Sequence, residues 1–204
     1  MDSEKRGTLL VISGPSGSGK GTVIKELRKI REELGFSVSA TTRAPREGEA
    51  DGVNYYFVSR DDFEDMLANK EILEHTVYNG NYYGTPRSEV ERVVSTGRDI
   101  ILEIETNGAR QIKQQFPDAV TVMLLPPDLK TLEERLTGRG TETAEVIASR
   151  LAIAHGEIRQ SDKYDYVVVN ETDKADEAAV IIGKILDAER QRPGRMKSFI
   201  ESFH

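Results

Sequence analysis

The chain of 204 residues lacks cysteine altogether. It therefore forms no disulfide, offers no thiolate to a metal and has no cysteine nucleophile. Its three histidines lie far apart in the sequence, which argues against a dedicated zinc site. No apolar run approaches the roughly 20 residues that cross a bilayer. Because the charged first residues lead straight into a short strand, we expect no signal peptide, no membrane partner and a cytoplasmic protein.

The excess of negative charge bears on whether the protein binds nucleic acid. The net charge is −7, which argues against non-specific nucleic-acid binding. If the substrate carries phosphates, its arginines must therefore be concentrated locally. A hydrophobic content of 37% suffices for a core, and the length predicts one domain over residues 1–204.

Short runs of Val, Ile and Leu alternate with segments of helical periodicity. Such runs are typical of strands buried on both faces in a parallel sheet. The sequence therefore predicts an α/β fold with a five-stranded parallel sheet flanked by helices. The expected strands are Thr8–Ser13, Phe36–Ala40, Asp99–Ile104, Ala119–Leu125 and Tyr164–Val169.

Residues 41–97 differ from the rest of the chain in composition, and this segment is predicted to form a small inserted lobe with a few strands and two helices. Five of the seven tyrosines lie there, around a hairpin turn signal at Asn79-Gly80. Ser59 stands three residues before Asp62, which is a spacing typical of a helix N-terminus. Past Arg190 we expect a loosely held basic tail, either solvated or in a subunit contact.

A glycine-rich segment follows the first strand and precedes a predicted helix, which is the context that a phosphate-binding P-loop requires. Its glycines let backbone N–H groups converge on phosphate oxygens, and the lysine adds a mobile charge for the β- and γ-phosphates of a nucleoside triphosphate. The alternative is an ordinary turn with a solvated lysine. The segment consists of Gly14, Pro15, Ser16, Gly17, Ser18, Gly19 and Lys20.

The residue after Lys20 departs from the usual P-loop pattern. It is Gly21, and the hydroxyl comes one position later at Thr22. A hydroxyl that would bind magnesium directly is therefore missing, and Thr22 is expected at the α-phosphate instead. We expect Mg²⁺ to be held mainly by the nucleotide's phosphates and water rather than by a protein metal site.

Three further segments resemble the guanylate kinase family: residues 36–46 (FSVSATTRAPR), 80–84 (GNYYG) and 138–142 (GRGTE). With the P-loop they stand in the family's order, and the resemblance extends to Asn170. It implies a P-loop kinase that phosphorylates GMP, and dGMP too, with ATP. It also implies a lobe over residues 41–97 that binds the monophosphate and a helical lid over residues 137–160.

The resemblance assigns the acceptor phosphate to Arg43 and Arg46, together with Tyr55, Tyr83 and Ser39. Two guanidinium groups grip a dianionic phosphate well because each offers a planar fork of donors. From residue type alone the arginines are equally well read as solvated surface charge, and the tyrosines as strand packing.

Base selection falls by the same resemblance to Glu74, Thr85 and Glu105, and Glu103 would orient magnesium-bound water. A carboxylate at Glu74 accepts from guanine N1–H and N2–H₂, whereas adenine would present a lone pair. Each acid also fits an ordinary strand-end charge. Thr85 has a specific alternative, since Thr followed by Pro86 is a good start for a helix. Glu105 is longer than the aspartate of some relatives.

Arg135, Arg139 and Arg150 match the family's lid arginines, and Asn170 resembles a residue near the adenine. Arginines that close over ATP neutralise charge in a loose phosphoryl transition state and exclude water. Surface pairing with nearby glutamates is the simpler alternative reading of the three arginines.

The reaction expected is direct in-line transfer with no side-chain nucleophile, and the catalytic group is Lys20, Arg46, Arg135, Arg139 and Arg150. A different class remains open, namely a catalytically silent guanylate-kinase-like module that binds a partner protein. A kinase for another monophosphate, such as AMP or a pyrimidine nucleotide, is a further alternative. The sequence leaves the oligomeric state undecided.

Overall fold

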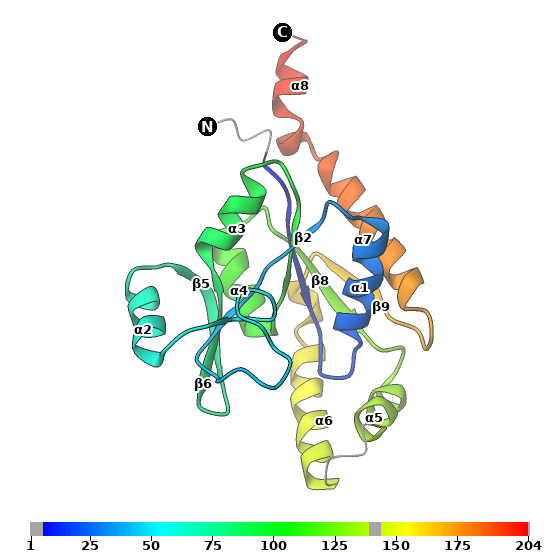
Figure 1. Ribbon diagram of the computed structural model, residues 1–204. Coiled ribbons are helices and arrows are strands. Elements are labelled where there is room, and N and C mark those ends of the chain that lie inside the picture. Colours follow the sequence, from blue (N-terminus) through cyan, green and yellow to red (C-terminus); the bar gives the residue numbers. More distant parts are fainter. Residues whose placement is uncertain (1–5, 139–143, 204) are drawn as a thin grey trace.

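A five-stranded parallel sheet forms the centre of the computed structural model, which describes residues 6–138 and 144–203 (Figure 1). Its strand order is β2-β7-β1-β8-β9, and every pairing in it is parallel. This sheet confirms the predicted fold class. Its strands are β1 (Leu9–Ser13), β2 (Gly35–Phe36), β7 (Ile100–Glu103), β8 (Val120–Leu125) and β9 (Tyr166–Val169).

Helices cover both faces of this sheet because its strands are apolar on both sides. In β1 the side chains of Leu10 and Ile12 pack with α1 (Lys20–Ile30) and α7 (Ala175–Arg190). Leu9 and Val11, which alternate with them, pack on the opposite face with residues of α3 and α4. The two remaining helices of this layer are α3 (Arg87–Val94) and α4 (Thr106–Gln115). All four β1 side chains are buried, which explains the continuous apolar run.

A second sheet of four strands, ordered β4-β3-β6-β5, lies beside the first and has its own small core. Phe63 is fully buried there with Ala40 and Ile72. The turn between β5 and β6 has positive φ at Asn79 and Gly80, as the hairpin signal predicts. The elements are β3 (Ala40–Thr41), β4 (Tyr56–Phe57), α2 (Arg60–Ala68), β5 (Ile72–Tyr78) and β6 (Asn81–Pro86).

The expected single strand Phe36–Ala40 is wrong, because the chain changes sheets within it. The N–H of Ser37 still bonds to the carbonyl of Ile101 in the large sheet, at 3.0 Å. Two residues later the carbonyl of Ser39 accepts from Tyr56 of the small sheet, at 2.9 Å. One extended strand cannot follow both ladders, so it divides into β2 and β3. By contrast Ser59 caps α2 as predicted, accepting from the Asp62 N–H at 3.0 Å.

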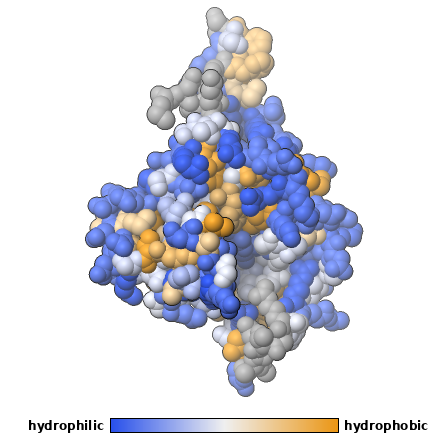
Figure 2. All heavy atoms as spheres, viewed as in Figure 1, coloured by the Kyte–Doolittle hydropathy of each residue, from blue (hydrophilic) through white to orange (hydrophobic). Residues whose placement is uncertain are grey.

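Two helices project from the carboxyl end of the sheet and pack on each other. They are α5 (Leu129–Thr137) and α6 (Ala144–Ile158), and Leu132, Leu136 and Ala154 form their buried contact. In the described part of the chain no helix is both long and apolar enough to span a membrane. At the other end a short helix, α8 (Lys197–Glu201), extends from the body and carries exposed hydrophobic side chains (Figure 2).

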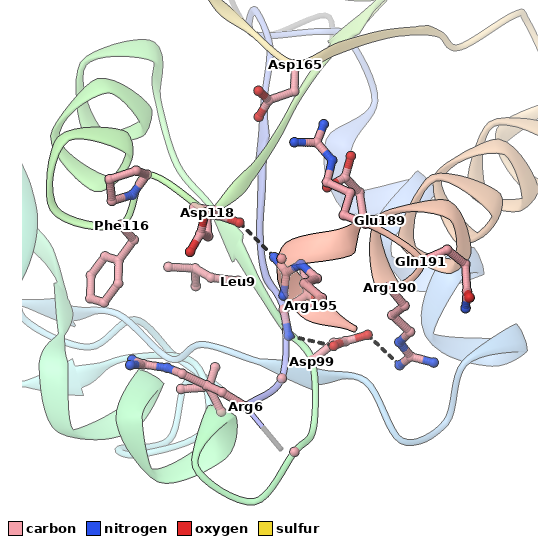
Figure 3. Close-up of a pocket in the computed structure, with 18 of the residues that line it drawn as sticks. Arg6, Leu9, Asp99, Phe116, Asp118, Asp165, Glu189, Arg190, Gln191 and Arg195 are labelled. Carbon is pink, nitrogen blue, oxygen red and sulfur yellow. Dashed lines mark hydrogen bonds and ion pairs between the residues drawn. The ribbon is translucent and has the colours of Figure 1, made fainter. Parts of the chain in front are cut away.

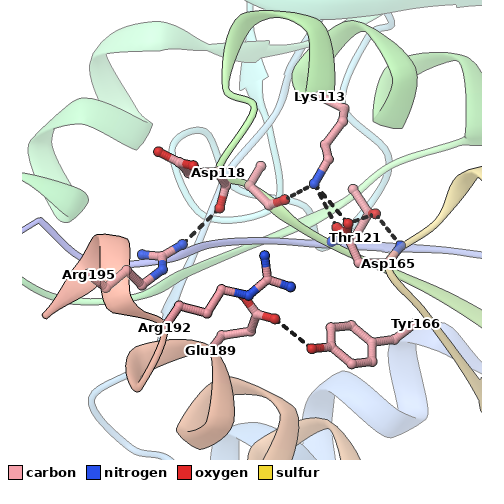
Figure 4. Close-up of polar contacts among 9 residues, drawn as sticks. Lys113, Asp118, Thr121, Asp165, Tyr166, Glu189, Arg192 and Arg195 are labelled. Atoms are coloured by element: carbon pink, nitrogen blue, oxygen red, sulfur yellow. Dashed lines mark hydrogen bonds and ion pairs between the residues drawn. The ribbon is translucent and has the colours of Figure 1, made fainter.

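The basic tail is attached to the end of the sheet opposite the P-loop. Arg190 pairs with the buried carboxylate of Asp99 at 2.6 Å, and that carboxylate also accepts from the Thr8 N–H (Figure 3). Arg195 donates to the Asp118 carbonyl at 2.8 Å (Figure 4). The expectation of a loosely held tail is therefore wrong as far as Arg195, because its arginines bind the chain's own body. Arg190 and Arg195 line a cavity of about 1140 Å³. Their guanidinium groups are bound to Asp99 and to the Asp118 carbonyl.

Candidate active site

The P-loop connects the end of β1 to the start of α1, and its glycines are required by close contacts. A Cβ at Gly14 would lie 2.2 Å from the Leu124 carbonyl oxygen, and φ there is +157°. At Gly19, where φ is +89°, a Cβ would lie 2.4 Å from Nδ2 of Asn170. Only glycine fits both positions. The loop leads into the N-terminus of α1, where backbone N–H groups and the helix dipole favour an anion.

Lys20 lies at the first position of α1 and bends back over the loop. Its Nζ donates to the Gly14 carbonyl at 2.7 Å. In the sheet register Ile12 lies beside Glu103, so that acid stands at the neighbouring strand end. Desolvation by the surrounding protein raises the pKa of Glu103, while the charge of Lys20 acts in the opposite direction. The structure thus places Glu103 within the electrostatic reach of the P-loop lysine.

Arg43, Tyr55 and Tyr83 come together in the small lobe. The guanidinium carbon of Arg43 lies 5.4 Å from the ring centre of Tyr55, and the two tyrosine rings meet edge to face at 5.9 Å. Burial raises the pKa of Tyr55. Arg46 is exposed, and Ser39 is partly buried directly before β3. Guanidinium and phenol groups both donate hydrogen bonds, so this group has the donors that a phosphate requires.

Glu49 organises this group and was missed by the sequence reasoning. Its Oε1 accepts from Arg43 Nη2 at 2.9 Å, and its Oε2 accepts from the Arg46 N–H at 2.7 Å. The hydrogen bond from Arg43 holds the pKa of Glu49 below its usual value, and the same bond raises the pKa of Arg43. The available signal was spacing, because an acid three residues after Arg46 is able to fold back on the loop.

The carboxylate of Glu74 is buried beside Thr85, with 5% of the residue exposed. Thr85 Oγ1 donates to Glu74 Oε1 at 2.7 Å. The antiparallel register of β5 and β6 brings these two side chains together, since the pairing of His75 with Gly84 sets Glu74 opposite Thr85. Burial raises the pKa of Glu74, and the nearby charge of Glu105 adds to that effect.

The helix-start reading of Thr85 is wrong. Pro86 is the N-cap of α3 and Arg87 its first residue, so Thr85 belongs to β6 and its hydroxyl is engaged by Glu74. Glu105 is the N-cap of α4 but makes no side-chain cap bond. Its exposed carboxylate acts on Glu74 through charge alone. The structure thus brings the three expected base-reading residues together.

The expected lid residues divide into three cases. Arg135 of α5 donates to the Asn170 carbonyl at 3.1 Å and to the Ser18 carbonyl at 3.5 Å, so it is attached to the P-loop. Arg150 is partly buried on α6. Arg139 lies outside the described residues. One acid on α6, Glu157, was not singled out from the sequence. Burial raises the pKa of Glu157, and the charge of Lys20 acts to lower it.

Asn170 follows β9 and is buried against the P-loop. Its Nδ2 donates to the Ser18 carbonyl at 2.8 Å and lies close to Gly19, so one amide N–H is engaged by the loop backbone. Gly21 and Thr22 are both exposed on the first turn of α1, and a Cβ at Gly21 would meet nothing within 4 Å. No group of three metal-binding side chains occurs within residues 6–138 and 144–203.

A P-loop at the carboxyl end of a parallel sheet faces a lobe that carries an arginine–tyrosine group and a buried carboxylate. This arrangement defines the class of P-loop kinases that act on small phosphorylated acceptors. Helices α5 and α6 border the same end of the sheet (Figure 1).

Comparison with known proteins narrows the class. A model of the guanylate kinase family matches residues 6–189. The guanylate kinase of Halalkalibacterium halodurans is 50% identical over 204 residues, covering 100% of this chain and 97% of that protein. That of Lactococcus lactis is 52% identical over 192 residues, 94% and 93% of the two chains. The crystal structure of guanylate kinase from Anaplasma phagocytophilum has a TM-score of 0.76 at 35% identity, covering 97% of this chain and 95% of that one. The chain belongs to the guanylate kinase family.

Proposed function

We propose that this chain transfers the γ-phosphoryl group of ATP to GMP, forming ADP and GDP. The observation that carries the acceptor's identity is the buried Glu74 carboxylate held by Thr85. Guanine offers it two N–H donors, whereas adenine offers a lone pair, and an unpaired buried carboxylate is costly. The assigned acceptor residues serve the phosphate and the base rather than the sugar, so dGMP is proposed as a second acceptor.

The reaction follows from groups that bind and neutralise charge. An oxygen of the GMP phosphate attacks the γ-phosphorus, the bond to the β–γ bridging oxygen breaks, and ADP leaves with that electron pair. The acceptor is already anionic, so no side chain need take a proton from it first. Lys20 and the P-loop amides hold the donor phosphates, while Arg43 and Arg46 hold the acceptor phosphate with Tyr55, Tyr83 and Ser39. Arg135, Arg139 and Arg150 are proposed to stabilise the negative charge that develops between the donor and acceptor phosphates in the transition state.

The residues present fit a magnesium ion that reaches the protein through ATP. Gly21 offers no ligand oxygen, and Thr22 is one residue beyond the usual position. Glu103, at the strand end beside β1, is proposed to orient water bound to the ion. When bound, the ion would withdraw charge from the phosphates. The lobe over residues 41–97 and the lid over 137–160 are proposed to close around the two nucleotides.

A parallel assay of ADP release tests the function. The protein is supplied with Mg·ATP and, separately, GMP, dGMP, AMP, CMP or UMP. Turnover with GMP and dGMP alone is expected. Comparable turnover with AMP or a pyrimidine nucleotide would contradict the role of Glu74. Binding of GMP without ADP release would instead favour the silent module.

A further inference from the structure

Helix α4 touches strand β5 at the residue that reads the base in the proposed function. The N-terminal turn of α4 contains Gly108, which is buried. A Cβ at this position would lie 2.4 Å from Oε2 of Glu74 and 3.1 Å from its Cδ. The backbone of the helix therefore sits directly against the one oxygen of Glu74 that Thr85 does not engage.

The same helix also binds the backbone of β5. The side-chain amide of Gln111 donates to the His75 carbonyl at 3.2 Å and accepts from the His75 N–H at 3.3 Å. Because β5 is an edge strand of the small sheet, these are backbone groups that no further strand pairs with in the described sheet. Gln115 adds a bond from its Nε2 to the Leu73 carbonyl. The residues on either side of Glu74 are thus both held by α4.

We propose that α4 sets the position of the guanine-reading carboxylate, with Gly108 and Gln111 as positioning residues for acceptor specificity. This inference rests on the proposed function. Gln111 fixes the strand on which Glu74 stands. Gly108, by lacking a side chain, leaves the space that Oε2 occupies. Thr85 then fixes the other oxygen, so that the carboxylate is defined from two sides before a base arrives.

Gly108→Ala separates this role from a structural one. In a helix, alanine is favoured over glycine by about 1 kcal/mol, which offsets the loss of the Glu74–Thr85 bond, so the variant is expected to fold with a melting temperature near that of the unmodified protein. The contact that must yield is the end of a flexible side chain, so Glu74 moves rather than the helix. The dissociation constant for GMP is expected to rise by about ten-fold or more, since the Thr85 bond is lost with the movement, while that for ATP stays within about two-fold.

Matched variants complete the experiment. Gly183→Ala, in α7, adds a Cβ whose nearest neighbour is 3.6 Å away and is expected to change neither constant. Gln111→Leu is expected to weaken GMP binding by about ten-fold because both bonds to His75 are lost. Gln114→Leu, on the exposed face of α4, is its control. In a Glu74→Asp background the effect of Gly108→Ala is expected to fall to about two-fold or less, because the shorter side chain withdraws from the new methyl group.

Calorimetric titration of GMP, AMP and ATP, together with steady-state kinetics, decides the outcome. GMP constants within two-fold of the unmodified protein for both Gly108→Ala and Gln111→Leu would overturn the inference and leave the proposed function intact. Equal weakening of GMP and ATP with a lowered melting temperature would also overturn it, since that is a structural effect. If the unmodified protein transfers no phosphoryl group to GMP, the proposed function fails, and the GMP dissociation constants still test the positioning role.

Discussion

The side-chain amide of Asn170 donates a hydrogen bond of 2.8 Å to the carbonyl oxygen of Ser18, although 152 residues separate them. Arg135 bonds to the Asn170 carbonyl at the same place. The P-loop is therefore held from outside by the end of β9 and by α5, not only by its own turn. Arg135 lies two residues before the segment proposed to close over ATP, residues 137–160, so the P-loop is joined to the base of that segment.

We predict that Asn170→Ala weakens the binding of ATP and lowers the stability of the fold. Loss of the bond to Ser18 is expected to lower the free energy of unfolding by about 1 kcal/mol, which corresponds to a fall of about 2–4 °C in melting temperature for a chain of this size. The KM for ATP is expected to rise several-fold, with that for GMP nearly unchanged. Calorimetric melting and kinetics measure both effects, and Asn69→Ala at the exposed end of α2 is the control. An equal rise of both KM values would argue against a specific effect on the loop.

Lys20→Met is predicted to abolish turnover. Its ammonium group bends over the P-loop, 2.7 Å from the Gly14 carbonyl, and the replacement keeps most of the length but none of the charge. Charge-stabilising groups in phosphoryl transfer are worth about 10³–10⁵ in rate, so kcat is expected to fall by about that factor. Lys25→Met, an exposed position on the same helix, is the comparison. A rate near that of the unmodified protein would contradict the phosphate-binding role of the loop.

Glu49→Ala is predicted to raise the KM for GMP about ten-fold without changing that for ATP. Glu49 accepts from Arg43 and from the Arg46 N–H, so its loss frees the segment that carries both arginines. A hydrogen bond to a charged group is worth about 1.5–3 kcal/mol, which covers a ten-fold change. Initial rates at varied GMP and varied ATP test this, with exposed Glu47→Ala as the control. The opposite result, tighter GMP binding, would mean that Glu49 competes with the phosphate for Arg43.

Glu74→Gln is predicted to stabilise the substrate-free protein while impairing GMP use. Burial raises the pKa of Glu74 in the folded state, so ionisation costs stability there. Below the unfolded value of about 4.3 the carboxyl is neutral in both states, and the variant and the unmodified protein should melt alike. As pH rises through the folded pKa, only the unmodified protein loses stability, and the gap in melting temperature should open and then level off.

Melting curves between about pH 4 and pH 8 test this prediction, together with kcat/KM for GMP at neutral pH. Glu71→Gln, at the exposed residue directly before β5, is the matched control and should show no such gap. A variant that is less stable at every pH would show that the carboxylate is needed for the fold itself.

The sequence predicts those parts of the molecule that depend on neighbouring residues. The P-loop, the Asn79-Gly80 turn and the Ser59 cap all follow from local backbone requirements, and the structure has them where expected. Strands β1, β7 and β8 of the large sheet follow from apolar runs that burial on both faces explains.

The remaining features depend on pairings that local patterns do not encode. Thr85 looks like the start of a helix until the pairing of β5 with β6 sets Glu74 opposite it. Ser37 and Ser39 look like one strand, yet they bond to different sheets. Glu49 is an unremarkable surface acid until its loop folds back on Arg43. Each case is a contact between distant or re-oriented segments, which a single sequence does not reveal.

The small sheet's separate core has a consequence for how the molecule opens. Phe63, Ala40 and Ile72 form a cluster of only a few side chains, apart from the two large clusters that pack on the five-stranded sheet. Regions with few buried apolar contacts open locally at a lower free-energy cost than the whole domain. Backbone amides of β6 and of the part of β5 beyond His75 should therefore exchange their hydrogens with solvent through partial opening of this sheet, while those of β1 and β8 exchange only through global unfolding. An acceptor bound between the lobe and the core would raise the cost of that first opening and leave the second largely unchanged, making the lobe an independent reporter of occupancy.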